Sequence, residues 1–305
     1  MRDTFVATLL EAAKKDKNII LMTGDLGYGV LDTFQRELPD QFINSGVNEQ
    51  AMMGMAAGYA STGKRVFVYS IGNFPTLRCL EQIRNDVCLM NNPVVIVSVG
   101  AGYAYGSQGY THHALEDIAV LRALPNMEVI VPADPAETAE LTTLIIASKK
   151  PTYLRLGKSG EPTIHTTRPK PAPGKINEIS TGTSGTLIFA GSVGTVAVAA
   201  ASALVEQGIS VAVASMPYIS TIDVDYLEKA LRIGPVIVIE EHSYRGGVGA
   251  AVLEAVNAAN LHGAIGLIAA DQNNLSQIGD QSFLRTANGI NVENIIAKFN
   301  ALVGD

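Results

Sequence analysis

Gly46-Val47-Asn48-Glu49-Gln50-Ala51-Met52-Met53-Gly54-Met55-Ala56-Ala57-Gly58 is the stretch that most constrains this sequence. It predicts a helix that begins at Glu49, with Asn48 as a suitable N-cap. After Glu49, apolar or small side chains lie on all sides of this helix. Because such a helix has no polar face, we expect it to be buried on every side. A buried carboxylate without a cationic neighbour in the sequence is costly unless it is protonated or tightly hydrogen-bonded. Glu49 is therefore either an ordinary acidic residue at a helix N-terminus or a carboxylate adapted for proton transfer.

The composition indicates a large core and a partly covered surface. The chain has 305 residues, of which 47% are hydrophobic and 17% are charged. This length and apolar content predict two domains. So few charges leave little for a fully solvated surface, and we expect another subunit to cover part of it. The formal net charge of −7 argues against nucleic acid and against an anionic membrane as the main partner.

The cysteines and the first residues of the chain predict a cytoplasmic protein. Cys79 and Cys88 lie in one predicted helix, 75–90, on nearly opposite faces, so that neither a disulfide nor a metal pair is expected. Unpaired cysteines fit a reducing cytosol, and the charged residues near the N-terminus do not fit a signal peptide. The uncharged segment 181–205 is divided by glycines, so we expect a strand, a turn and a helix there rather than a membrane span.

Short β-rich runs alternate with helical stretches through most of the chain, which predicts an α/β fold with parallel sheets covered on both faces. The predicted strands are 18–23, 65–71, 94–99, 128–131 and 152–156 in the first half, and 186–190, 210–215, 236–240 and 264–269 in the second. The predicted helices are 3–15, 49–62, 75–90, 114–123 and 135–148, followed by 195–207, 223–232, 247–258 and 292–299.

Prolines between residues 162 and 173 punctuate a polar stretch that separates the two halves. We therefore predict two doubly wound domains, at residues 1–160 and 183–305, joined by a linker at 161–182.

Glycine-rich turns follow several of the predicted strands, at 24–29, 100–109 and 191–194. Turns of this kind can present backbone N–H groups to phosphate. None of them matches a Walker loop or a convincing G-x-G-x-x-G motif after the first strand. The simplest interpretation is that these glycines allow tight turns of the backbone. The sequence therefore gives only weak support for the binding of a nicotinamide dinucleotide.

Two further clusters are candidates for ligand contact. His112 follows a glycine-rich loop between a strand and a helix, where open α/β sheets bind ligands. A lone loop histidine can equally be a surface group, and the residues around it do not make a recognisable metal site. Phe74 follows the end of a predicted strand and either packs in the core or stacks on a flat heterocycle.

Taken in order, these segments resemble the C-terminal half of transketolase, in the split form that is made as two subunits. The resemblance spans nearly the whole chain. The matching segments are Arg2, Gly24-Asp25-Leu26, Gly46-Val47-Asn48-Glu49-Gln50, Glu81-Gln82-Ile83-Arg84-Asn85, Gly109-Tyr110-Thr111-His112-His113, Pro125-Asn126-Met127, Val131-Pro132-Ala133-Asp134, Tyr153-Leu154-Arg155-Leu156-Gly157, Glu240-Glu241-His242 and Gly246-Gly247-Val248-Gly249.

The resemblance implies that the first domain is a pyrimidine-binding domain for thiamine diphosphate and the second a transketolase C-terminal-like domain. In that family the glutamate matching Glu49 hydrogen-bonds ring nitrogen N1′ and promotes the imino tautomer that removes the thiazolium proton. Phe74 and Ile71 fall at the two positions that wall the pyrimidine, and an isoleucine there is a departure that weakens one stacking face. Asp25, within its matching segment, is assigned to the cofactor site with them.

The resemblance also implies substrate contacts. His112 matches a histidine that contacts the substrate, and Arg2 and Lys158 match basic positions that hold sugar phosphate. Gln108 stands where the family usually has an aspartate that reads a sugar hydroxyl. Two further positions that contact the donor's phosphate, a histidine and a serine in the family, are Gly100 and Gly29. These departures predict that at least one substrate is not an ordinary pentose or hexose phosphate.

One family motif is missing. Thiamine enzymes of this family hold magnesium and the diphosphate with a Gly-Asp-Gly motif and a distant Asn, and this chain contains no Gly-Asp-Gly. We therefore expect no metal ligands in this chain and a partner α-type subunit that supplies the diphosphate-binding domain, in an α2β2 assembly. The expected reaction is transfer of a ketol unit between sugars or sugar phosphates. Alternatives are the β subunit of a 2-oxo acid dehydrogenase, a deoxyxylulose-phosphate-synthase-like enzyme, and a non-catalytic subunit that retains the fold.

Overall fold

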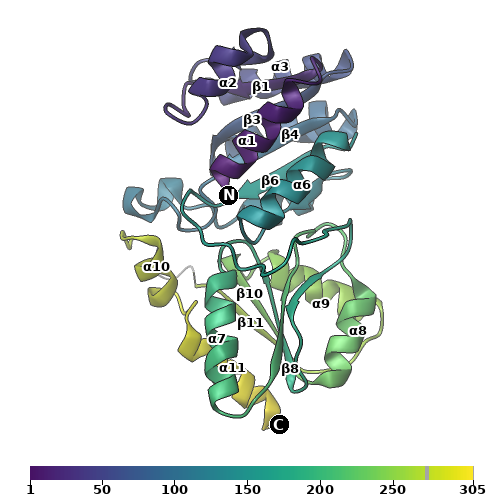
Figure 1. Cartoon of the computed structure of the whole chain (residues 1–305), viewed down its shortest axis with the longest axis vertical. Coiled ribbons are helices and arrows are strands. Elements are labelled where there is room, and N and C mark those ends of the chain that lie inside the picture. The colour runs from purple at the N-terminus through teal and green to yellow at the C-terminus, as the bar shows by residue number, and fades with distance from the viewer. Residues whose placement is uncertain (272–274, 305) are drawn as a thin grey trace.

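The computed structural model describes residues 1–271 and 275–304 and contains two α/β units, one above the other in Figure 1. The first sheet has six strands in the order β2-β1-β3-β4-β6-β5, and all neighbouring strands are parallel. They are β1 (Ile19–Thr23), β2 (Phe42–Asn44), β3 (Arg65–Ile71), β4 (Val94–Val99), β5 (Glu128–Ile130) and β6 (Thr152–Leu156).

Helices cover both faces of this sheet because its central strands are apolar on both sides. Along β3, Val66 and Val68 face one core, and Phe67 between them faces the other. One face is covered by α1 (Arg2–Ala13), α2 (Asp32–Glu37) and α6 (Pro135–Ala147). The opposite face is covered by α3 (Glu49–Ser61), the π-helix η3 (Ile83–Leu89) and α5 (Asp117–Arg122).

The second sheet repeats this layered arrangement. Its strand order is β11-β10-β8-β9-β7, parallel except for β7, which pairs antiparallel with β9. Its strands are β7 (Asn177–Ser180), β8 (Gly185–Ala190), β9 (Val211–Ser215), β10 (Val236–Ser243) and β11 (Ile265–Ala270). In Figure 1, α7 (Gly194–Glu206) and α11 (Val292–Val303) lie on one side, and α8 (Val224–Ile233) and α9 (Val248–Ala258) lie on the other. The prediction of two doubly wound α/β domains is confirmed.

Several elements differ from the expectations. The expected linker 161–182 includes β7, and the boundaries of the two domains stay a prediction. The expected helix 75–90 is found over residues 77–89 as three consecutive segments of different helix type: η2 (Leu77–Cys79, 3-10), α4 (Leu80–Gln82, α) and η3 (π). Cys79 and Cys88 thus lie in different elements, and both are buried and free. Over residues 1–271 and 275–304, no helix combines the length and apolarity needed to cross a membrane.

The helix α3 is buried on one side rather than on every side. Glu49, Met52, Met53, Ala56, Ala57 and Ala60 face the core. Val47 before the helix, and Met55 and Tyr59 on its other side, remain exposed, with exposed fractions of 75%, 39% and 42%. The expectation of burial all round was wrong for the single chain, because the sheet can cover only one side of a helix packed on it.

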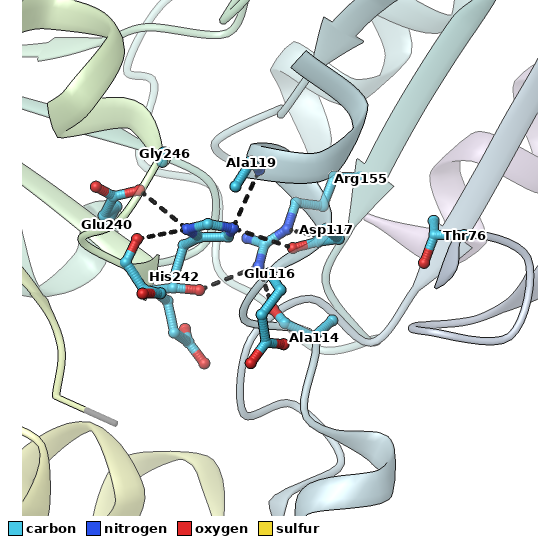
Figure 2. Close-up of polar contacts among 12 residues, drawn as sticks. Thr76, Ala114, Glu116, Asp117, Ala119, Arg155, Glu240, His242 and Gly246 are labelled. Atoms are coloured by element: carbon cyan, nitrogen blue, oxygen red, sulfur yellow. Dashed lines mark hydrogen bonds and ion pairs between the residues drawn. The ribbon is translucent and has the colours of Figure 1, made fainter. Parts of the chain in front are cut away.

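A buried polar network joins the two domains (Figure 2). Arg155 on β6 donates from Nε to Asp117 (2.7 Å) and from Nη2 to the carbonyl oxygen of Ala114 (2.6 Å). The same Nη2 also reaches the carbonyl oxygen of Glu241 on β10 at 3.1 Å. Tyr153 donates its hydroxyl to Asp117 at 2.5 Å. One guanidinium therefore holds a strand of each sheet in place.

His242, next to Glu241 on β10, completes this network. Its Nδ1 lies 2.6 Å from the carbonyl oxygen of Ser243, while Nε2 lies 3.4 Å from the backbone nitrogen of Ala119 and 3.7 Å from Asp117. Burial lowers the pKa of His242 to about 4. The imidazole is therefore neutral at neutral pH, with the proton on Nδ1 donated to the carbonyl and Nε2 accepting from the amide.

Candidate active site

The predicted site residues gather at the carboxyl ends of the parallel strands of the first sheet. Asp25 follows β1, Ile71 ends β3, and Lys158 follows β6. In open α/β sheets this edge is where ligands bind, because the loops that leave the strands converge there. The backbone nitrogen of Arg2, at the start of α1, lies 3.2 Å from the carbonyl oxygen of Lys158, which brings the chain's second residue to the same edge.

Glu49 is the first residue of α3, and its side chain is buried. Asn48 caps the helix by accepting a hydrogen bond from the N–H of Ala51 at 3.2 Å. The Glu49 side chain is only 3% exposed. Its Oε2 accepts a hydrogen bond from Nη1 of Arg78 at 2.8 Å. The carboxylate thus has a cationic partner that is distant from it in the sequence, because the segment after β3 folds back over the start of α3.

Arg78 also lies against Phe74. Its Cζ atom is 4.7 Å from the centroid of the Phe74 ring, a cation–π arrangement. The guanidinium therefore touches both the carboxylate and the aromatic ring that the resemblance assigns to the pyrimidine. Arg78 was not among the site residues predicted from the sequence. The available signal was a single arginine four residues after Phe74, but no regular helix spans this segment to relate the two positions.

His112 lies on the far side of this small cluster. Its ring makes an edge contact with Phe74, with 5.4 Å between the ring centroids. Its Nδ1 is 3.0 Å from the hydroxyl of Thr111. The adjacent His113 is buried, within 3.4 Å of the carbonyl oxygen of Gly106, and packs edge-on against Tyr103. Of the two histidines, only His112 is therefore placed beside the predicted cofactor residues.

A tight turn carries Ile71 and Phe74 together. The N–H of Phe74 donates to the carbonyl oxygen of Ile71 at 3.0 Å. Gly72 between them has φ of +43°, and both Ser98 and Thr76 donate their hydroxyls to its carbonyl oxygen. The turn therefore holds the backbones of Ile71 and Phe74 close together at the end of β3.

Asp25 stands at the rim of the site rather than inside it. Its carboxylate is exposed and accepts hydrogen bonds from Tyr28 (2.7 Å) and Asn44 (3.1 Å). The Tyr28 hydroxyl, followed by the Asn44 amide, lowers the pKa of Asp25. Asn44 Oδ1 in turn accepts from the N–H groups of Asp25 and Gly46, both at 3.0 Å, which ties the loop after β1 to the loop before α3.

Arg2 and Lys158 form a basic pair around Tyr105. The ammonium of Lys158 lies 5.4 Å from the centroid of the Tyr105 ring. Arg2 is close enough for its charge and a hydrogen bond to act on the same tyrosine, although burial is the larger effect and raises the pKa of Tyr105. Arg2 also donates from Nε to Asp3 at 2.8 Å. Tyr105, which organises the pair, was not among the site residues predicted from the sequence.

Tyr105 also explains why residue 100 is a glycine. Gly100 has φ of +94°, and a Cβ atom added there would lie 2.2 Å from the Tyr105 ring. A histidine at this position would displace the tyrosine. Gln108 is exposed at the end of η4 (Gly106–Gln108), before η5 (Tyr110–His112). Its side chain is thus available to a ligand rather than committed to packing.

The geometry suits a flat, cationic or hydrogen-bond-donating aromatic ring. A buried carboxylate and an aromatic face both contact one planar guanidinium, so the same two groups can bind another planar donor. No group of three or more His, Cys, Asp or Glu side chains in the described ranges, 1–271 and 275–304, is arranged to hold a metal ion.

Comparisons with known proteins show which family the two domains resemble. The family model for the transketolase pyrimidine binding domain matches residues 1–162, and that for the transketolase C-terminal domain matches residues 174–294. The chain is 40% identical to an apulose-4-phosphate transketolase subunit of Phocaeicola vulgatus, over 84% of this chain and 83% of the relative. It is 31% identical to the 6-deoxy-6-sulfo-D-fructose transketolase subunit SqwH of Clostridium sp., over 84% of this chain and 80% of the relative.

A solved structure is similar over almost the full length. It is described as "Split gene transketolase, inactive beta4 tetramer", with a TM-score of 0.88 and 30% sequence identity. The alignment covers 99% of this chain and 97% of that chain.

Proposed function

We propose that this chain, which belongs to the transketolase family, is the pyrimidine-binding subunit of a split enzyme that transfers a ketol unit from a ketose donor to an aldose acceptor. The observation that carries the proposal is the meeting of Glu49, Phe74 and His112 at the carboxyl edge of the first sheet. Retention of all three together argues against a non-catalytic subunit.

The cofactor that fits these residues is thiamine diphosphate. When bound, it supplies the carbon nucleophile that attacks the donor carbonyl. Glu49 would hold ring nitrogen N1′ and share a proton with it from a buried position, where water does not compete. Phe74 would orient the ring by stacking, with His112 beside it for a substrate oxygen. Magnesium and the diphosphate would be held by the partner α-type chain, in an α2β2 assembly in the cytoplasm.

The isolated chain is expected to bind thiamine diphosphate weakly and to show no ketol transfer. The reason is that it offers the pyrimidine half of a site without the Gly-Asp-Gly motif for the other half. The similar split-gene protein is described as an inactive tetramer of its β chain, which supports this expectation. Calorimetric titration with cofactor and magnesium, with and without the partner α-type chain, measures the difference. Micromolar binding by the chain alone would contradict the half-site argument.

We propose that at least one of the two substrates, donor or acceptor, is a modified sugar that carries an anionic group. Arg2 and Lys158 keep positive charge at the rim, while Gly100 and Gly29 lack side chains that could bind a phosphate. Loss of one charge-assisted hydrogen bond costs about 1.5–3 kcal/mol, or about ten- to a hundredfold in affinity. Two relatives are named for unusual sugars, apulose 4-phosphate and 6-deoxy-6-sulfo-D-fructose, in line with a relaxed or altered phosphate site.

Kinetics of the reconstituted complex test this proposal. With xylulose 5-phosphate and ribose 5-phosphate, kcat/KM is expected to fall below about 10⁵ M⁻¹s⁻¹, the lower part of the usual enzyme range. The two sugars named by the relatives serve as comparison donors. Full efficiency with the ordinary pentose phosphates would refute the substrate proposal and leave ketol transfer intact. Consumption of pyruvate would instead favour a synthase or 2-oxo acid dehydrogenase.

A further inference from the structure

Arg78 contacts the same two groups that the proposed function assigns to the aminopyrimidine ring. Its guanidinium donates to Glu49 at 2.8 Å and lies 4.7 Å from the Phe74 centroid. We infer that Arg78 occupies the pyrimidine position in the unpartnered chain, and that it must leave Glu49 and Phe74 before the cofactor can bind. This inference rests on the proposed function, because it takes these residues as the pyrimidine site.

The chemistry of the guanidinium explains why it can stand in for the ring. It is planar, carries positive charge, and presents N–H donors in the plane, so it can stack on an aromatic face while hydrogen-bonding a carboxylate at its edge. An aminopyrimidine makes the same pair of contacts when its N1′ carries the proton that it shares with the carboxylate, because the ring edge then donates while the ring face stacks on the aromatic side chain. Because the ring and the guanidinium would each use the Glu49 carboxylate and the Phe74 face, we expect them to compete for these two groups.

The two partners of the ion pair differ in their freedom to move. The Glu49 side chain is 3% exposed and is fixed at the first turn of α3, whereas the Arg78 side chain is 47% exposed. Arg78 lies in η2, a single turn between the Phe74 loop and α4. It can therefore swing toward solvent without unpacking the core, and Glu49 stays in place to receive the cofactor.

This arrangement also has a use in the free subunit. A buried carboxylate without a partner is strongly destabilising, and Arg78 provides that partner while no cofactor is bound. The cost appears on binding, because a site that is open for only a fraction of the time has an apparent affinity reduced by that fraction. The arginine would thus protect the isolated subunit and weaken its affinity for the ring.

The test uses the full chain and the probe 4-amino-5-hydroxymethyl-2-methylpyrimidine, which carries the ring without the diphosphate. Arg78→Ala is expected to bind the probe about tenfold more tightly than the unchanged chain, since it removes one half-exposed ion pair and one cation–π contact. Arg84→Ala is the matched control. Arg84 is an exposed arginine six residues further on, hydrogen-bonded to Asn85, and its loss is expected to leave the probe affinity unchanged.

Two further measurements separate site occupancy from a general effect on folding. Arg78→Lys keeps the charge but loses the planar stack, so it is expected to bind the probe with intermediate affinity and to fold normally. Methylguanidinium is expected to compete with the probe in Arg78→Ala, whereas sodium chloride at the same concentration is not.

The inference is overturned if Arg78→Ala and Arg78→Lys bind the probe no more tightly than Arg84→Ala, or do not bind it at all. That result is distinguishable from failure of the proposed function. If cofactor C2 exchange in the assembled complex still depends on Glu49, the function stands and only the role of Arg78 is wrong.

Discussion

Glu49→Gln is expected to slow hydrogen–deuterium exchange at C2 of thiamine diphosphate by about 10²- to 10⁴-fold in the assembled complex. The carboxylate is buried at the first turn of α3. When an amide replaces it, water therefore cannot take over the exchange of a proton with N1′. Glutamine has nearly the same shape, its oxygen can still accept from Arg78, and the Asn48 cap is untouched. The variant should therefore fold and assemble.

Rapid-quench NMR of the exchange reaction measures this effect directly. Glu206→Gln is a matched control, because Glu206 is an exposed residue at the end of α7 in the second domain. It is expected to leave exchange unchanged. An assembled Glu49→Gln complex with normal exchange would show that Glu49 only caps and stabilises the start of a helix.

Arg155→Leu is expected to lower the free energy of unfolding by about 3–5 kcal/mol. The substitution leaves the buried Asp117 with the hydroxyl of Tyr153 as its remaining close donor among the described residues, and it removes the link from β6 to the Glu241 carbonyl oxygen. Burial works against ionisation of Asp117, but the charge of Arg155 and its hydrogen bond keep the Asp117 pKa lowered. Without the arginine, a buried charge remains uncompensated.

Urea unfolding followed by circular dichroism measures the loss. Arg168→Leu is the control: Arg168 also binds a carboxylate, that of Glu140 at 2.6 Å, but its side chain is 80% exposed. That substitution is expected to cost about 1 kcal/mol or less. Replacing Asp117 and Arg155 together by leucine should recover part of the stability, because no unpaired charge is left. Equal losses for the two arginines would mean that the buried network between the domains contributes little.

The layered architecture could be predicted because its signals are local. The apolar run Val94–Val99 has the length and β-branched content of a strand buried on both faces, and the structure places β4 at the same residues. Asp25, Ile71 and Lys158 were assigned through the family resemblance, and the structure places them at one edge because the carboxyl ends of parallel strands share an edge. The pattern within each segment was enough to predict the strands and helices, and the buried position of Glu49 followed from the apolar residues after it.

Contacts between segments distant in the chain were decided only by the tertiary structure. Neither the pairing of Arg78 with Glu49, 29 residues apart, nor that of Arg155 with Glu241, 86 residues apart, has a periodic signal. The exposure of one side of α3 could likewise not be predicted from the sequence. An apolar helix has the same residue pattern whether its own chain or another subunit covers it. Hydrophobic periodicity records which residues are withdrawn from water, but the partner of a buried charge depends on how loops close in three dimensions.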